Sequence, residues 1–309
     1  MEYVGIQTQI RRNNLYTTLQ LILFPVLLGL TVYAIAYLLT TKSKGGSNAD
    51  LPAVLLATFI GTSVWFLIAY FFHNRIILAA TGAKPLERTE NKRVYNLVEN
   101  LCISQGMKMP KVYMIEDDSL NAFASGINES SFSITLSRGI INKLDDAELE
   151  AVIAHELTHI INRDVRLLII TIIFVGIFSF ISEVALRSLR FSGRGDSKDG
   201  RARLVMILVI ILITALAYFL ATLLRFGISR NREYMADAGS AQLTKNPQAL
   251  ASALRKIQAD PYIEAVQNRD VAQLFIEHPS VKESGFSIAN LFATHPPIEK
   301  RIQLLEQFT

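Results

Sequence analysis

Hydrophobic and polar positions are segregated along this chain, because many of the apolar residues fall in long runs that contain no charge. Three such runs cover residues 13–41, 51–74 and 204–224. Each is as long as the roughly 20 residues that an α-helix needs to cross about 30 Å of hydrocarbon. A fourth run, 167–182, would extend only about 24 Å as a helix. The pattern predicts two transmembrane helices within residues 15–73 and two further transmembrane or membrane-embedded helices within residues 167–225.

The segments outside these runs have the patterns of a folded domain. Apolar positions recur at helical spacing in residues 92–105 and 147–161, and Asp145 with Glu148 forms a capping-box pattern before the second helix. The other predicted elements are strands at 111–116, 121–126 and 132–137, a helix at 225–242, and a last helix after Pro296-Pro297. We therefore predict an α+β fold that is mainly α and contains a small β-sheet.

The chain ends and the loops complete this organisation. Residues 1–14 form a short polar head, and residues 187–203 are rich in glycine and charge, which predicts a flexible loop between the last two apolar runs. The first apolar run is about twice as long as the hydrophobic region of a signal peptide. We therefore expect an uncleaved membrane anchor.

Composition narrows the class of protein further. Half of the residues are hydrophobic and 19% are charged, below the typical share of about 25%. The net charge of +4 comes from scattered basic residues, so we expect no nucleic-acid partner. The single cysteine, Cys102, excludes an intramolecular disulfide and fits a reducing compartment.

Candidate chemistry lies in residues 155–159, which read His-Glu-Leu-Thr-His and match the H-E-x-x-H pattern. Residues four apart share one face of a helix, so His155 and His159 can bind the same metal ion. Glu156 can then act on water at the metal without being a ligand, as metal-assisted hydrolysis requires. The neighbouring residues are apolar, and two buried imidazoles without a metal would leave costly unpaired polar groups. The pattern predicts a Zn²⁺ site with Glu156 as general base.

A catalytic zinc ion takes three protein ligands, so a third must come from elsewhere in the chain. No third histidine follows at the metzincin spacing, because residues 162–164 read Asn-Arg-Asp. Glu233 and Asp237 lie four apart in a predicted helix, so that one could bind the metal while the other orients a ligand histidine. Spacing alone does not decide between them. A surface ion-pair cluster that includes Arg232 is the alternative.

Several motifs, in order over most of the chain, resemble the HtpX family of membrane metalloproteases and, more distantly, the CAAX prenyl proteases. They are the H-E-x-x-H segment followed by Asn162-Arg163-Asp164, the segment Arg232-Glu233-Tyr234-Met235-Ala236-Asp237, and the closing His295-Pro296 with Arg301. The stretch Asn121-Ala122-Phe123-Ala124 resembles the edge segment that lines the substrate cleft in that group.

The resemblance implies a zincin-like catalytic domain that is built from residues 74–166 and 226–309 and carries a gluzincin site. The implied zinc ligands are His155, His159 and Glu233. The residues implied to support the site are Asp237, Asp164 and Arg301. An active-site role in stabilising the oxyanion is implied for His295. Substrate binding is implied for Asn121, Ala122 and Phe123.

The resemblance also implies polypeptide substrates, above all membrane proteins, and a role in protein quality control and stress response. The implied location is the bacterial inner membrane, with several spans in the lipid bilayer and the catalytic domain facing the cytoplasm. A separate argument is that ligands from 74–166 and 226–309 can meet at one ion only if both segments lie on the same side of the membrane.

Three alternatives to a quality-control protease stay open, to different degrees. A specific processing protease, including one for prenylated chains, would use the same chemistry. A zinc-dependent scaffold or chaperone would need the ligands but not Glu156. A transporter is disfavoured, because the three long runs carry no interior charge to mark an ion path. The sequence does not indicate an oligomeric state.

Overall fold

The computed structural model describes residues 6–40, 50–171, 173, 211, 215, 230–259 and 296–308. Most of the third and fourth apolar runs and the predicted loop 187–203 lie outside the described residues. The chain forms two compact units. The first contains residues 1–14, 72–169 and 226–309, and the second contains residues 15–71 and 170–225.

The first unit contains a four-stranded mixed sheet with the order β1-β2-β4-β3. Its strands are β1 (Lys84–Pro85), β2 (Lys111–Ile115), β3 (Ala122–Ser125) and β4 (Ser133–Ser137). β2 and β4 are parallel, whereas β1 and β3 each run antiparallel to their neighbour. The three predicted strands are confirmed within one or two residues, and β3 occupies an edge of the sheet.

The predicted helices flanking the sheet are confirmed as α3 (Lys92–Ser104) and α5 (Asp146–Ile161). α5 begins with the predicted capping box: the Asp145 carboxylate accepts the Glu148 amide at 2.9 Å, and the Glu148 carboxylate accepts the Asp145 amide at 3.0 Å. These contacts satisfy two amides that have no partner within the helix. Eleven of the sixteen residues of α5 are buried, so this helix is the centre of the unit.

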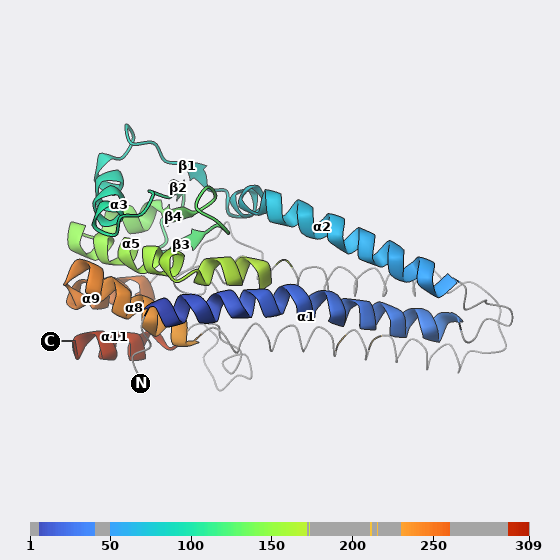
Figure 1. The fold of residues 1–309 in the computed structure, drawn as a ribbon. Coiled ribbons are helices and arrows are strands. Elements are labelled where there is room, and N and C mark those ends of the chain that lie inside the picture. The colour runs from blue at the N-terminus through green and yellow to red at the C-terminus, as the bar shows by residue number, and fades with distance from the viewer. Residues whose placement is uncertain are drawn as a thin grey trace. The chain divides into compact units, whose positions relative to one another are not determined.

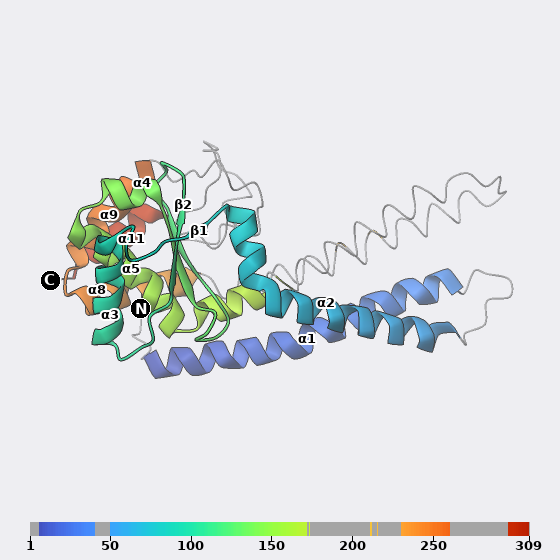
Figure 2. The same cartoon turned by 90° about the horizontal axis from the view of Figure 1, so that it is seen from above.

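Among the described residues, the unit has four further helices: α4 (Arg138–Lys143), α8 (Arg230–Thr244), α9 (Pro247–Ala259) and α11 (Ile298–Glu306). Figure 1 shows α5 between the sheet with α3 on one side and α8 with α9 on the other, and Figure 2 looks down on these layers from the side of α3 and the sheet. α11 packs on α8 and α9. It buries Ile298, Ile302 and Leu305, as the predicted amphipathic pattern requires.

α8 approaches α5 very closely at two adjacent positions. A Cβ atom at Gly239 would lie only 2.4 Å from Cγ2 of Thr158, so glycine is the residue that permits this contact. Next to it, the Ser240 hydroxyl donates to the Ala151 carbonyl at 2.6 Å. These contacts fix the position of α8 along α5 and therefore set which side chains of the two helices meet.

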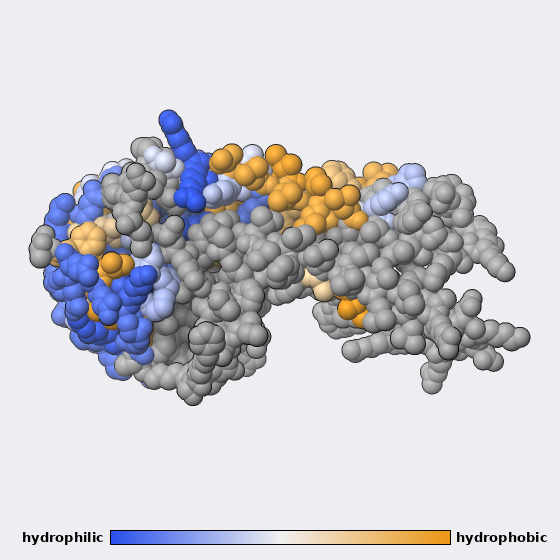
Figure 3. All heavy atoms as spheres, turned by 90° about the horizontal axis from the view of Figure 1, so that it is seen from below, coloured by the Kyte–Doolittle hydropathy of each residue, from blue (hydrophilic) through white to orange (hydrophobic). Residues whose placement is uncertain are grey.

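The two long apolar helices are α1 (Ile6–Thr40) and α2 (Asp50–Thr81). Within them, Ile10–Leu30 and Phe59–Thr81 are long and apolar enough to cross a membrane. Their large hydrophobic side chains are extensively exposed, and the orange surface in Figure 3 shows this for α1. α1 begins at Ile6, so much of the segment predicted as a separate polar head is helical. The charges there end the apolar run but not the helix.

Candidate metal centre

The two histidines of the H-E-x-x-H pattern lie on one face of α5 and point to the same place. Their Nε2 atoms are 3.2 Å apart. His155 is fully buried, and the His159 side chain is 14% exposed. Two ring nitrogens this close and this buried are suited to sharing a single cation.

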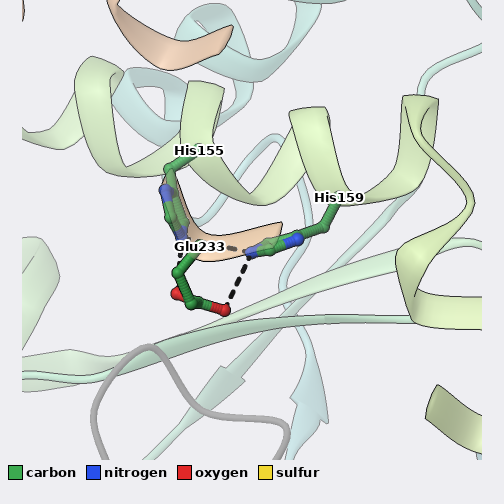
Figure 4. Close-up of side chains that lie close together, drawn as sticks. All are labelled: His155, His159 and Glu233. Carbon is green, nitrogen blue, oxygen red and sulfur yellow. Dashed lines mark hydrogen bonds and ion pairs between the residues drawn. The ribbon is translucent and has the colours of Figure 1, made fainter. Parts of the chain in front are cut away.

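Glu233 of α8 reaches the same point from the opposite side, as Figure 4 shows. One carboxylate oxygen lies 3.6 Å from Nε2 of His155, and the other lies 3.6 Å from Nε2 of His159. The three donor groups form one potential metal-binding cluster. Ligands at about 2.1 Å from a tetrahedral zinc ion are separated by about 3.4 Å. The three residues therefore fit such an ion in donor chemistry and in spacing.

A second carboxylate lies behind each histidine. Nδ1 of His155 is 3.0 Å from Asp237, and Nδ1 of His159 is 3.2 Å from Asp164. A carboxylate in this position holds the proton on Nδ1, which leaves the lone pair of Nε2 for a metal. Both predicted supporting acids thus lie where metal-binding histidines need them.

Arg301, fully buried on α11, connects the acids around His155. Its Nε and Nη2 atoms form a paired contact with Asp237 at 2.9 and 2.7 Å, and Nη1 lies 3.2 Å from Glu233. Burial by itself favours a protonated Asp237, but the charge of Arg301 and the contact with His155 hold the pKa of Asp237 below its ordinary value. Asp237 therefore stays ionised and accepts a hydrogen bond from Nδ1–H of His155.

The site as a whole attracts positive charge. Burial alone would lower the pKa of His155, but its hydrogen bonds to Asp237 and Glu233 raise that pKa to about 9. A cation held between these residues is stabilised by the same carboxylates. The electrostatics thus agree with the donor geometry.

Glu156 follows the first histidine and is only 2% exposed. Burial raises its pKa above the ordinary value, while the two neighbouring histidines and the backbone of Ala124 partly oppose this shift. A carboxylate with a raised pKa is a better proton acceptor. The contact with Ala124 also places Glu156 beside β3.

The segment predicted to bind substrate forms the start of this edge strand. Asn121, Ala122 and Phe123 are all buried. The Asn121 carbonyl accepts the Ser137 amide at 3.0 Å, and its side-chain oxygen accepts the Ala122 amide at 3.0 Å. Backbone groups alternate in direction along an antiparallel strand, so Ala122 and Ala124 direct theirs away from β4. Any contact of these three residues with a peptide would therefore use the backbone of β3.

One described residue near the candidate metal centre is not indicated by any pattern in the sequence. Asn13 of α1 donates to Asp164 at 2.6 Å, beside Arg232, whose Nε lies 3.4 Å from the same oxygen. No local pattern indicates this contact, since Asn13 and Asp164 are 151 positions apart. The predicted active-site residue His295 lies outside the described residues.

Two histidines of an H-E-x-x-H helix meet Glu233 of a second helix, and the buried Glu156 lies beside them. This arrangement defines the class of the metallopeptidases. Residues 88–309 match the model of peptidase family M48, and the chain belongs to that family. Together with the relatives described next, this makes it a membrane metalloprotease, and the resemblance to the HtpX family is confirmed.

The chain is 59% identical to a protease HtpX homolog of Bacteroides fragilis, over 100% of both chains. It is 36% identical to a protease HtpX homolog of Lactobacillus helveticus, covering 97% of this chain and 98% of the relative. Among solved structures, the crystal structure of S. mikatae Ste24p matches with a TM-score of 0.44 and 19% identity, over 96% of this chain and 66% of that one.

Proposed function

We propose that this protein is a zinc-dependent endopeptidase that hydrolyses peptide bonds of membrane or misfolded proteins. The observation that carries the proposal is the cluster of two imidazole nitrogens and one carboxylate, separated by 3.2–3.6 Å, with a buried glutamate next to the first ligand. His155, His159 and Glu233 would hold the ion. Bound Zn²⁺ would supply Lewis-acid chemistry that lowers the pKa of water toward about 7.

The remaining steps belong to side chains of this protein. Glu156 accepts a proton from the attacking water and then delivers it to the leaving amine, which its raised pKa favours. Asp237 and Asp164 hold the protons on Nδ1 of the two histidines. Arg301 keeps Asp237 ionised. A role of His295 in stabilising the oxyanion is proposed from the family resemblance.

The edge of β3 that faces away from β4 is the proposed binding site for the substrate backbone. An extended peptide can add to a sheet edge through main-chain hydrogen bonds, which select chain conformation rather than sequence. The contact between Ala124 and Glu156 supports this proposal, because it joins this strand to the proposed general base. Broad specificity, as quality control requires, would follow from binding of this kind.

We further propose that the protein lies in the bacterial inner membrane with several spans and with the catalytic unit in the cytoplasm. Support comes from the two apolar helices α1 and α2 and from the further apolar runs in the sequence. The single cysteine agrees with a reducing compartment.

Proteolysis by the purified protein in detergent tests the function. We expect cleavage of casein or of the protein itself, loss of cleavage after a chelator removes the metal, and recovery on addition of stoichiometric Zn²⁺. A metal-depleted protein that cleaves as fast as the zinc-loaded one would contradict the proposal.

A further inference from the structure

Near its start, α1 carries a buried polar residue that is tied to the end of α5. Asn13 is 1% exposed, and its side-chain nitrogen donates to the Asn162 carbonyl at 2.7 Å and to the Asp164 carboxylate at 2.6 Å. Both partners are acceptors, so the nitrogen of the amide, and not its oxygen, faces them. The two N–H groups of Asn13 thus match two acceptors.

The two oxygens of the Asp164 carboxylate have different partners. One oxygen, Oδ2, faces Nδ1 of His159 at 3.2 Å. The other, Oδ1, is held by Asn13 at 2.6 Å and by Nε of Arg232 at 3.4 Å. Because a carboxylate is planar, fixing one oxygen also fixes the direction from which the other accepts a hydrogen bond. The position of the His159 ring therefore depends on contacts made at Oδ1.

The same arrangement is present on the other side of the cluster. Behind His155, Asp237 accepts a hydrogen bond from the ring N–H, and the paired contact with Arg301 fixes that carboxylate. Each potential ligand histidine thus has a supporting acid, and each acid has a donor that holds it. On the His159 side, the shortest of these donor contacts comes from Asn13.

We propose that Asn13 is a positioning residue of the metal centre, which acts through Asp164 on His159. The proposal rests on the proposed role of His159 as a zinc ligand. It extends the metal centre to a residue that lies outside residues 88–309, the part of the chain that matches the family model. The first apolar helix then serves the chemistry of the site as well as anchorage.

Zinc affinity of the purified protein, measured by competition with a chelator, is the test. Asn13→Leu keeps the size of the side chain but removes the donor. Loss of a group behind a ligand histidine typically weakens metal binding about 10–100-fold. Since Asn13 acts one residue further out, we expect affinity to fall by about 3- to 30-fold. Unchanged affinity would overturn the proposal.

Gln20→Leu is the matched control. Gln20 lies on the same face of α1, is 3% exposed, and donates to Oγ1 of Thr171 at 2.8 Å. It therefore also contributes a buried amide hydrogen bond, but one that does not involve Asp164. We expect wild-type zinc affinity in Gln20→Leu. An equal loss in both variants would show that packing of α1, and not the contact with Asp164, matters, and would contradict the proposal.

A double-mutant cycle with Asp164→Asn separates positioning from general stability. If Asn13 acts through Asp164, adding Asn13→Leu to Asp164→Asn should weaken zinc binding by less than about 2-fold more. Losses that simply add would contradict the proposal. If Asn13→Leu does not fold, Asn13→Ala takes its place in the same cycle with the same expectation.

The outcomes also distinguish this proposal from the proposed function. Wild-type protein that binds no zinc would remove the basis of both. Wild-type protein that binds zinc tightly, with Asn13→Leu and Asn13→Ala binding it equally tightly, would leave the protease function intact and remove only the role of Asn13.

Discussion

Three of the four buried carboxylates around the two histidines differ in chemical role because their surroundings differ. Asp237, in contact with Arg301, has a pKa below its ordinary value and remains an anion that holds a proton on His155. Glu156 has a pKa that burial raises, which suits a group that takes up and releases a proton. Glu233 presents its oxygens to both Nε2 atoms, which suits a ligand.

Glu156→Gln tests the assignment of the general base. The substitution keeps the shape of the side chain but removes its ability to accept a proton. We expect unchanged zinc content and a fall in proteolysis of about 10²-fold or more. Zinc by elemental analysis and casein cleavage by the same preparation are the measurements. Near-wild-type cleavage by a zinc-loaded variant would show that another group is the base.

At the residue scale, the sequence predicts which residues of one helix act together, but not which residues far apart in the chain are in contact. His155, His159 and Glu156 follow from spacing on one helix. The choice of Glu233 over Asp237 needs the family resemblance, because nothing in their spacing separates ligand from support. The contact of Asn13 with Asp164 joins residues 151 positions apart, and a lone asparagine in an apolar run gives no sign of its partner.

Among the secondary-structure elements, the pairing of α8 with α5 decides whether Glu233 meets the histidines. The two helices touch where Gly239 faces Thr158, and the Thr158 hydroxyl donates to the Ala154 carbonyl at 2.8 Å. That hydrogen bond limits rotation of the Thr158 side chain. An added methyl group at Gly239 would therefore push the helices apart.

Gly239→Ala should weaken zinc binding by about 10-fold or more, on the scale of losing a group that orients the ligands. Replacing glycine by alanine within a helix normally stabilises the helix by about 1 kcal/mol. A loss of zinc affinity would therefore identify the close contact with Thr158 as its cause. Thr158→Ala in the same chain should restore much of the affinity. Gly61→Ala is the control, because a Cβ atom there meets no other atom within 4 Å. Unchanged affinity in Gly239→Ala would contradict this account of the helix pairing.

Glu148 connects the start of α5 to α9. Its carboxylate accepts from Ser252 at 2.7 Å and from Lys256 at 2.6 Å, in addition to its capping contact. Burial favours its protonated form, but these hydrogen bonds outweigh burial and lower the pKa of Glu148. A carboxyl group whose pKa is lower in the folded state stabilises that state above its unfolded pKa of about 4.3.

We therefore expect Glu148→Gln to lower the free energy of unfolding by about 1–2 kcal/mol at pH 7. The difference between wild type and variant should shrink as the pH falls below about 4.3 and the wild-type carboxylate takes up a proton. Denaturant unfolding in detergent between pH 7 and pH 3 is the measurement. A difference that stays constant over this range would show that the charge of Glu148 does not contribute.

The helices and strands with strong local sequence signals are predicted correctly, whereas β1 and α9 are not predicted. The capping box at Asp145 and the strand patterns gave α5 and three strands. β1 has two residues and is defined by its pairing with β2, which local sequence cannot show. α9 did have a signal, since Leu250, Leu254 and Ile257 recur at helical spacing after Pro247, and they are fully buried.

The catalytic unit of the whole molecule is assembled from segments that are far apart in the sequence. Residues 72–169 supply the sheet and α5, and residues 226–309 supply α8, α9 and α11. The family resemblance predicted that these two segments meet, because it assigns zinc ligands to both of them. It could not predict that residues 1–14 belong to the same unit, since that depends on a hydrogen-bonded contact at the end of α5.

Membrane topology can be tested by labelling single cysteines in a variant without Cys102. Cysteines at the exposed positions Lys92 and Lys300 should react only after the inner membrane is permeabilised, because we propose that both face the cytoplasm. A cysteine at Ser47, between the first two predicted spans, should react in cells whose inner membrane is intact. Labelling of Lys92 and Lys300 from opposite sides would contradict the proposed topology.

The zinc content of purified Glu233→Ala, compared with wild type and Asp237→Ala, tests the central claim most directly. Two histidines alone leave zinc with too few protein ligands for a tight site, whereas loss of a supporting acid weakens binding about 10–100-fold without removing a ligand. We predict about one zinc per wild-type chain, a largely empty site in Glu233→Ala, and partial occupancy in Asp237→Ala. Stoichiometric zinc in Glu233→Ala would contradict the assignment of His155, His159 and Glu233 as the metal-binding set.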